Sequence, residues 1–266
     1  MFSRFVALGD STTEGMNDPD GRGGYRGWAD RLAERIAGTW PDLAYANLAV
    51  RGKVASQVLA EQVPAALALR PDLATVEVGL NDALRPKFDA GVVAGHVGTM
   101  VSALTASGAH VLVFTMPDPS PFMPLGRPLR GRLFAFNDVV REVASTHGAA
   151  VLDLGAHPVA SDPRLWSADR LHANPLGHAR LADAAADALG LAGSSNRWTL
   201  PLPPLPPRAA RERVAAEVAW ARQHLVPWLA RHVRGRSSGD DRRAKRPELL
   251  PVTSSPAGKR QVADGA

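Results

Sequence analysis

The chain has 266 residues, of which 45% are hydrophobic, and it contains no cysteine. This length is sufficient for one domain with a full core and an additional segment. The absence of cysteine excludes disulfides, thiolate metal sites and a cysteine nucleophile. No apolar stretch is long enough to cross a bilayer and the N-terminal residues lack the features of a signal peptide, so we expect a cytoplasmic protein.

The formal net charge of +5 is concentrated towards the C-terminal end. Residues 201–266 contain 13 of the 31 Lys and Arg residues but only 6 of the 26 Asp and Glu residues. The part of the chain before residue 201 is therefore nearly neutral. Any affinity for anionic partners is expected only of the C-terminal region.

Short apolar runs alternate with segments of helical periodicity over the first two-thirds of the chain. The apolar runs predict five strands, at residues 5–8, 44–48, 73–78, 110–114 and 150–153. The periodic segments predict helices at residues 28–36, 54–69, 92–107, 133–147 and 175–189. Pro64 falls inside the second of these helices and is expected to kink or divide it. The alternation predicts an α/β fold with three α/β/α layers and a five-stranded parallel, flavodoxin-like sheet.

Small and polar residues follow four of the five predicted strands. Ser11 follows the first strand, Gly52 the second and Asn81 the third, while Asp169 and His172 lie beyond the fifth. Parallel sheets bind ligands at the carboxyl ends of their strands. We therefore expect these five residues to meet at one edge of the sheet.

A serine, an aspartate and a histidine in this arrangement predict nucleophilic catalysis. A serine hydroxyl is a poor nucleophile until a base removes its proton, and a third group must orient that base. Ser11 is the candidate nucleophile and His172 the candidate base, and Asp169 can reach the far nitrogen of the imidazole ring. The backbone N–H groups of Ser11 and Gly52 and the side-chain amide of Asn81 are candidate donors to an oxyanion.

Four sequence blocks resemble those of the SGNH hydrolases, the superfamily of GDSL esterases and lipases. The blocks are Gly9-Asp10-Ser11, residues 47–52 ending at Gly52, residues 79–82 with Asn81, and Asp169-Arg170-Leu171-His172. The resemblance extends over about residues 5–190, and the first block departs from Gly-Asp-Ser-Leu in having Thr12.

This resemblance implies an SGNH hydrolase fold and a cofactor-free serine esterase. It implies a catalytic triad of Ser11, His172 and Asp169, with an oxyanion hole formed by Ser11, Gly52 and Asn81. The implied substrate is a small-molecule carboxylic ester, either acyl or acetyl. The sequence leaves open which acyl group and which alcohol the natural ester contains.

Each of these residues also has a simpler structural interpretation. Ser11 would cap the following helix, and Asn81 would form a turn. Asp169 and His172 would be ordinary loop residues. The occurrence of all four residues in one pattern favours catalysis over these interpretations. The alternative function is a flavodoxin-like module in which residues 9–15 cradle a phosphate or nucleotide without hydrolysis. That loop lacks the Gly-Lys-Ser/Thr of a P-loop.

Metal binding has little support in the sequence. The chain has no cysteine and no pair of histidines at ligand spacing on a helix, so we expect no metal and no other cofactor. Hydrolysis by a serine and an amide-lined hole requires no metal ion. His178 lies inside the last predicted helix, and we expect it to be structural.

A proline-rich loop follows the fourth predicted strand at the same edge of the sheet. Residues 116–124 contain four prolines and the apolar pair Phe122 and Met123. The loop is expected either to form a rigid apolar rim beside the pocket or simply to pack on the domain. Together with Trp166, these residues favour an apolar acyl group or an aryl leaving group.

The composition changes beyond residue 191 and divides the chain into four parts. We expect a catalytic domain at residues 1–192, a Pro-rich linker at 193–207, a basic amphipathic helical extension at 208–233 and a disordered tail at 234–266. Pro227 is expected to kink or end the helix of the extension.

The helical extension has two alternative roles. An amphipathic helix of this kind more often packs back on its own domain, here through Trp220 and Trp228, than it binds a membrane surface or nucleic acid. We therefore expect no nucleic-acid partner, and contact of the basic region with a membrane surface is the less favoured alternative. The sequence leaves the oligomeric state open.

Overall fold

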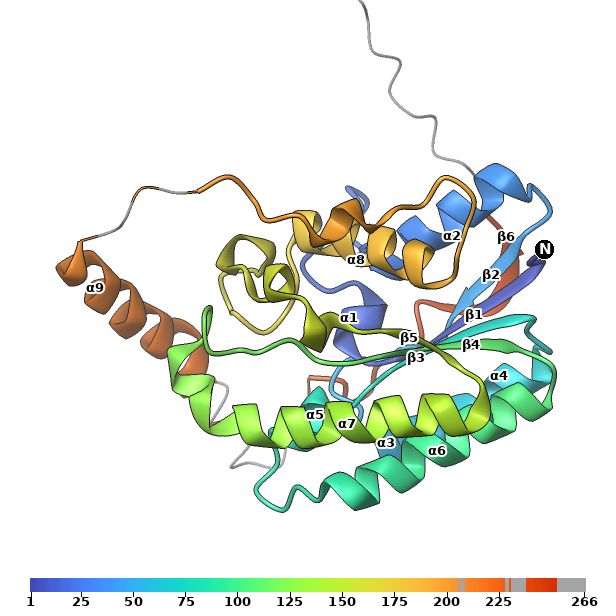
Figure 1. Ribbon diagram of the computed structural model, residues 1–266, viewed down its shortest axis with the longest axis horizontal. Coiled ribbons are helices and arrows are strands. Elements are labelled where there is room, and N and C mark those ends of the chain that lie inside the picture. Colours follow the sequence, from blue (N-terminus) through green and yellow to red (C-terminus); the bar gives the residue numbers. More distant parts are fainter. Residues whose placement is uncertain (205, 207–208, 228–229, 231–237, 253–266) are drawn as a thin grey trace, which may run out of the picture.

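A six-stranded sheet forms the centre of the protein (Figure 1). The strands are arranged in the order β5-β4-β3-β1-β2-β6; neighbours from β5 to β2 pair in parallel, and β6 is antiparallel to β2. The computed structural model describes residues 1–204, 206, 209–227, 230 and 238–252. The strands are β1 (Arg4–Gly9), β2 (Ala44–Asn47), β3 (Leu73–Glu77), β4 (His110–Phe114), β5 (Ala150–Leu152) and β6 (Arg246–Pro251).

Helices cover both faces of the sheet, with α2 and α8 on one face and α4, α6 and α7 on the other (Figure 1). The three-layer α/β/α fold predicted from the sequence is therefore confirmed. The helices are α1 (Ser11–Glu14), α2 (Gly27–Thr39), α3 (Ala55–Gln57), α4 (Val63–Ala68), α5 (Leu80–Ala83), α6 (Ala90–Ala106), α7 (Arg130–His147), α8 (Pro175–Ala188) and α9 (Ala210–Trp220).

The central strands are apolar throughout because both of their faces are covered. Successive side chains of a strand point to opposite faces of the sheet. In β1, Phe5 and Ala7 therefore join the core beneath α2 and α8, whereas Val6 and Leu8 join the core beneath α6 and α7. All four side chains are buried. Burial on both faces explains why the strand appears in the sequence as a continuous apolar run.

The sixth strand corrects the sequence analysis, which expects five strands and disorder over residues 234–266. β6 pairs with β2 in the register Ala44↔Pro251 and Tyr45↔Leu250. Arg246 Nε also donates to the carbonyl oxygen of Tyr45 at 2.7 Å. Without β6, β2 would be an edge strand with unpaired backbone groups. The prolines of this segment suggest an irregular tail, but they are tolerated here because β6 itself lies at the edge.

The helix expected at residues 54–69 is divided into three parts. α3 is followed by a π-helical turn at Val58–Gln62 and then by α4. Pro64 lies in the first turn of α4, where its missing N–H costs no helical hydrogen bond. The proline therefore divides the helix, as its position in the sequence predicts.

The beginning of the expected linker packs on α8. The Trp198 side chain is buried, and its Nε1–H donates to Asp187 Oδ2 at 3.0 Å. Arg180 Nη1 donates to the carbonyl oxygens of Trp198 (2.7 Å) and Leu200 (2.6 Å). The chain therefore continues to pack on the three-layer domain for several residues beyond the expected boundary at 192.

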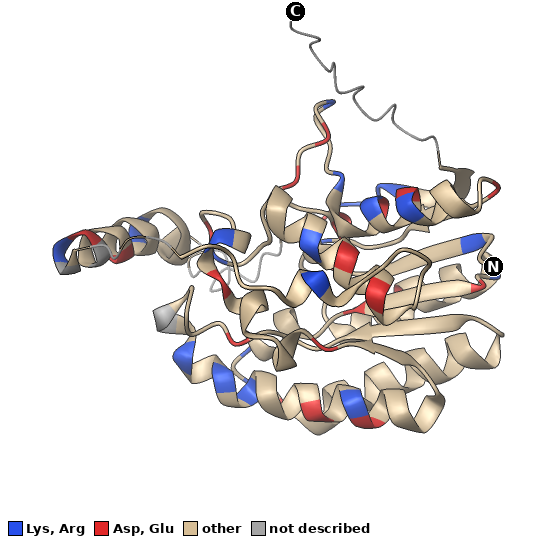
Figure 2. Cartoon of the chain, turned by 45° about the horizontal axis from the view of Figure 1, so that its top comes forward, with Lys and Arg blue, Asp and Glu red and all other residues tan. Residues whose placement is uncertain are grey.

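α9 and a π-helical turn at Ala221–Leu225 lie within the expected helical extension, and this turn stands just before Pro227. Trp228 and residues 231–233 of that extension, and residues 253–266 of the expected tail, lie outside the described residues. The described part of α9 contains Arg211, Glu212 and Glu217, so this part carries charges of both signs (Figure 2). No helix within the described residues is both long and apolar enough to span a membrane.

Candidate active site

The turn after β1 brings Ser11 to the carboxyl edge of the sheet. Ser11 is the first residue of α1, and the Asp10 side chain caps this helix by accepting a hydrogen bond from the backbone N of Thr12 at 3.2 Å. Gly9 has a φ of +153°, and a Cβ at this position would lie 2.4 Å from the carbonyl oxygen of Glu77. Only glycine therefore fits this close approach of β1 to β3.

Ser11 and the distant pair Asp169 and His172 form one continuous hydrogen-bonded chain. His172 Nε2 lies 2.9 Å from Ser11 Oγ, and His172 Nδ1 lies 2.8 Å from Asp169 Oδ2. Asp169 Oδ1 accepts from the backbone N atoms of Leu171 (3.0 Å) and His172 (3.1 Å). Oδ1 of Asp169 therefore fixes the shape of the loop, while Oδ2 holds the His172 ring.

The surroundings of Asp169 keep it ionised. Burial alone would raise its pKa, but hydrogen bonds from the His172 ring and from the backbone of Leu171 and His172 lower the pKa below its ordinary value. Asn17 adds a further donor, because its Nδ2 lies 2.9 Å from Asp169 Oδ2. Asn17 has a φ of +67°, a conformation that asparagine tolerates better than most residues. The sequence analysis does not identify Asn17 as part of the site.

The two remaining candidate residues lie on the loops after β2 and β3. Gly52 has a φ of +77°, in the left-handed region that glycine adopts without strain. Asn81, on the short helix α5, donates from Nδ2 to Asp10 Oδ2 at 2.7 Å and to the carbonyl oxygen of Lys53 at 3.0 Å. Asn81 therefore connects the turn that contains Asp10 and Ser11 to the loop that contains Gly52.

Two further contacts, absent from the sequence analysis, hold these loops together. Glu14 of α1 forms a buried ion pair with Arg51, whose backbone N also donates to Glu14 Oε2 at 2.8 Å. Gln62, at the end of the π-helical turn, accepts from Gly9 N and donates to Gly9 O, both at 2.9 Å. The loops on either side of Ser11 are thus fixed by buried polar side chains.

Residues 7–180 match the family model of the GDSL-like lipases and acylhydrolases. The chain belongs to this family. It is therefore a hydrolase of the esterase type, and the four sequence blocks that resemble the SGNH hydrolases lie at one edge of its sheet.

Individual known proteins are similar to this chain at low sequence identity. An arylesterase of Vibrio mimicus is 24% identical over 188 residues, which cover 70% of this chain and 88% of the relative. The crystal structure of TesA has a TM-score of 0.60 at 24% identity and covers 70% of this chain and 98% of TesA. A variant of Axe2, an acetyl xylan esterase from Geobacillus stearothermophilus, has a TM-score of 0.59 at 17% identity. The match covers 71% of this chain and 95% of that variant. These structures share the fold of this GDSL-family chain.

Two carboxyl groups, those of Asp10 and Glu77, are buried near the candidate nucleophile of this GDSL-family site. Burial raises the pKa of Asp10 to about 6, although the Thr12 N–H and the His172 ring act to lower it. Burial and the charge of Asp10 raise the pKa of Glu77 well above its ordinary value. A protonated Glu77 can donate to Asp10, and it also accepts from Thr13 Oγ1 at 3.2 Å. Asp10 therefore remains an acceptor for Asn81 without leaving two charges in the core.

His178 has a structural environment, in agreement with the sequence analysis. Its side chain is fully buried, Nδ1 accepts from the backbone N of Trp28 at 3.2 Å, and Nε2 donates to the carbonyl oxygen of Met16 at 2.9 Å. Burial lowers the pKa of His178 to about 4, so the ring is neutral at pH 7. His178 thus connects α8 to α2 and to the segment that follows α1.

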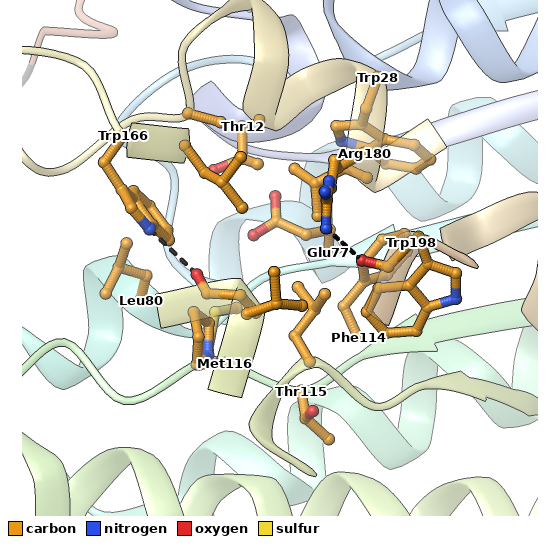
Figure 3. A pocket seen from close by; sticks show the side chains of 18 residues that line it. Thr12, Trp28, Glu77, Leu80, Phe114, Thr115, Met116, Trp166, Arg180 and Trp198 are labelled. Atoms are coloured by element: carbon orange, nitrogen blue, oxygen red, sulfur yellow. Dashed lines mark hydrogen bonds between the residues drawn. The ribbon is translucent and has the colours of Figure 1, made fainter. Parts of the chain in front are cut away.

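Figure 3 shows an apolar pocket whose lining includes chain neighbours of the candidate site residues. Thr12, Leu80 and Ala173, the chain neighbours of Ser11, Asn81 and His172, are part of its lining. One lining donor, Trp28 Nε1, is buried and has no hydrogen-bond partner. The rest of the lining consists mainly of apolar side chains, including Phe114, Leu154, Val159, Ala160, Leu165, Trp166, Leu181 and Trp198.

The proline-rich loop after β4 both packs on the domain and contributes to this pocket. Phe122 is buried and stacks on Trp166, with ring centroids 4.2 Å apart and planes 8° from parallel. Met116 and Pro117, at the start of the loop, line the pocket. The two alternatives of the sequence analysis therefore both apply, to different residues of the loop.

The described residues contain no group of three or more His, Asp and Glu side chains arranged to hold a metal ion.

Proposed function

We propose that this chain is a serine esterase that hydrolyses a carboxylic ester through an acyl-enzyme. The main support is the hydrogen-bonded chain from Ser11 Oγ through the His172 ring to Asp169, with lengths of 2.9 and 2.8 Å. When Nδ1–H of the neutral ring donates to Asp169, the lone pair of Nε2 faces the Ser11 hydroxyl and can accept its proton.

In the acylation step, Ser11 Oγ bonds to the carbonyl carbon of the ester while its proton passes to His172 Nε2. The bond between that carbon and the alcohol oxygen then breaks, and the leaving oxygen takes the proton from Nε2. In the deacylation step, a water molecule gives a proton to Nε2 and bonds to the acyl carbon. Ser11 Oγ leaves with that proton, and the products are a carboxylic acid and an alcohol. Ionised Asp169 stabilises the imidazolium in both steps.

We assign the oxyanion donors to the backbone N–H groups of Ser11 and Gly52 and to Nδ2 of Asn81. The amide of Asn81 is held in place by its hydrogen bonds to Asp10 and to the carbonyl oxygen of Lys53. An oxyanion must therefore share one of these hydrogens or displace the bond to Lys53. Loss of one such donor typically lowers turnover by about 10²–10³-fold.

The apolar pocket supports an acyl group larger than acetyl as the part of the substrate that it binds. Burial of each additional CH₂ group in such a pocket is worth about 0.8 kcal/mol. The aromatic side chains Phe114, Trp166 and Trp198 would provide much of this contact area. We therefore propose an apolar acyl or aryl-acyl ester as the substrate class.

The loop at residues 9–15 does not favour the alternative of a phosphate-binding module. The carboxylate of Asp10 already caps the N-terminus of α1, where a phosphate would bind. The Gly9 N–H is also committed to Gln62. A negatively charged ligand would meet a carboxyl group at this position instead of free N–H donors.

The test of the proposed function is labelling with a fluorophosphonate probe, which reacts with activated serine nucleophiles. Wild-type protein is expected to be labelled and to hydrolyse p-nitrophenyl esters, whereas Ser11→Ala is expected to lose both. His172→Ala is expected to lose nearly all turnover while its far-UV circular dichroism remains that of the wild type. Equal ester turnover by wild type and Ser11→Ala would refute the proposal.

A further inference from the structure

The C-terminal extension contacts the loop that contains the candidate base. α9 lies beyond residue 180, where the match to the GDSL family ends, and projects from the side of the molecule (Figure 1). Trp220 Nε1 nevertheless donates to the backbone carbonyl oxygen of Asp169 at 3.1 Å. Glu217 forms an ion pair with Arg170 at 2.7 Å. The extension therefore binds the two residues that begin the Asp169–His172 block.

The contacts of α9 come from one face of the helix. Residues three apart lie on the same face of a helix, which places Glu217 beside Trp220. The Arg170 guanidinium lies over the Trp220 ring, 4.9 Å from its centroid, so both α9 side chains bind the same arginine. Trp220 is only 7% exposed, whereas Val214 and Val218 of the same helix are exposed. The buried face of α9 is therefore the face that meets the catalytic loop.

The conformation of this loop requires external support. Arg170 has a φ of +57°, in the left-handed region, where a non-glycine residue is strained. A conformation of this kind persists only where neighbouring contacts hold it. Asp169 immediately precedes this residue, and His172 follows it by two positions. A change in the Arg170 backbone would therefore alter the hydrogen bond between Asp169 and the His172 ring.

The extension also contacts the other side of the site. Gly239 packs against the loop after β2 so closely that a Cβ there would lie 1.9 Å from the carbonyl oxygen of Arg51, the neighbour of Gly52. Lys245 then donates to the carbonyl oxygens of Tyr25 (2.9 Å) and Arg26 (2.8 Å), and β6 joins the sheet. The extension thus meets the loops on both sides of Ser11.

We propose that the described parts of the C-terminal extension, residues 209–227 and 238–251, form a brace of the active site and that Glu217 and Trp220 are positioning residues for the Asp169–His172 loop. This inference rests on the proposed serine-esterase function. The brace reduces the freedom of the loop, so that the His172 ring is already aligned with Ser11 when the substrate binds. Because neither residue lines the apolar pocket, the brace acts on kcat more than on KM.

The test compares full-length variants that remove single contacts of the brace. Trp220→Phe keeps an aromatic ring but removes the N–H donor to Asp169, and Glu217→Gln removes the charge that pairs with Arg170. Loss of a hydrogen bond worth about 0.5–1.5 kcal/mol corresponds to a fall of about 2–13-fold. We expect falls of this size in kcat for a p-nitrophenyl ester and in the rate of fluorophosphonate labelling, with KM unchanged. The matched control is Val218→Ala, a change at an exposed position of the same helix that should retain wild-type kinetics.

The outcomes separate the brace from the proposed function. Labelling of wild type but not of Ser11→Ala, with slower labelling of both brace variants, supports the brace. Labelling of both brace variants at the wild-type rate overturns it and leaves the esterase proposal intact, whereas an unlabelled wild type overturns the esterase proposal. Thermal unfolding is measured for each variant. If Trp220→Phe unfolds below the assay temperature, Glu217→Gln decides the question, since it changes only a partly exposed ion pair.

Discussion

At the scale of single residues, the two oxygens of Asp169 have different partners. Oδ1 accepts from two backbone N–H groups of its own loop, and Oδ2 accepts from the His172 ring and from Asn17. An ionised aspartate can accept all four of these hydrogen bonds because both of its oxygens are acceptors. An asparagine has one acceptor oxygen and one NH₂ group, so it cannot replace both functions.

The first prediction concerns this difference. Asp169→Asn is expected to lower kcat by about 10²–10⁴-fold, because the amide no longer fixes the His172 tautomer or stabilises the imidazolium. Asn17→Ala removes only one donor to Asp169 and is expected to lower kcat by about 2–13-fold. Steady-state kinetics with a chromogenic ester measure both effects. The assignment of Asp169 fails if Asp169→Asn retains half of the wild-type kcat.

At the scale of elements, the pocket is formed where the carboxyl ends of β3 and β4 face α8 and the loops that precede it. Glu77 and Phe114 end these strands, and Leu181 projects from α8 (Figure 3 shows the first two). The loop between β5 and α8 completes the lining with Ala160 and Leu165. The pocket is therefore a product of how one helical layer meets the sheet.

The second prediction tests whether this pocket binds the acyl group. Ala160→Phe fills part of the pocket, so kcat/KM for a p-nitrophenyl octanoate is expected to fall at least tenfold while kcat/KM for the acetate changes less than twofold. The lost burial of two or more CH₂ groups, at about 0.8 kcal/mol each, accounts for a change of this size. The matched control is Ala65→Phe, at an exposed position of α4. Equal effects of Ala160→Phe on both esters would contradict the assignment.

At the scale of the whole molecule, the last described part of the chain adds a strand beside β2 and so becomes the edge of the sheet. β6 covers β2, and Lys245 forms an ion pair with Asp30 of α2. Burial raises the pKa of Asp30 to about 6, while the charges of Lys245 and Arg246 act to lower it. The unfolded chain releases this proton near the ordinary value of 3.8. The folded protein therefore binds more protons than the unfolded chain between about pH 4 and 6, and Asp30 lowers its stability as the pH rises through this range.

The third prediction follows from the sign of this effect. Lys245→Met removes the charge that opposes the raised pKa of Asp30, so the folded-state pKa rises further and the loss of stability extends to higher pH. We expect the Tm difference between wild type and Lys245→Met to be larger at pH 8 than at pH 5, by about 2–4 °C. Asp10 and Glu77 titrate in both proteins, so their contributions to stability cancel in the Tm difference. Lys245→Arg serves as the control, and equal Tm differences at the two pH values would contradict the prediction.

The sequence by itself determined the layered fold, the family and the edge of the sheet at which the site forms. It could do so because hydrophobic periodicity is a local property, and because parallel strands place the residues that follow them at a common edge. Ser11 and His172 could thus be paired although 161 positions separate them.

Only the tertiary structure decided which other residues support that site. Gln62 forms hydrogen bonds with Gly9, and Asn17 donates to Asp169. Trp220, which lies beyond the residues that match the family, donates to the carbonyl oxygen of Asp169. The sixth strand also depended on tertiary contacts, because the composition of its segment indicates disorder and β2 supplies its partner. These contacts join side chains and backbone atoms across long separations in the chain, where no local pattern of residue types records which groups will meet.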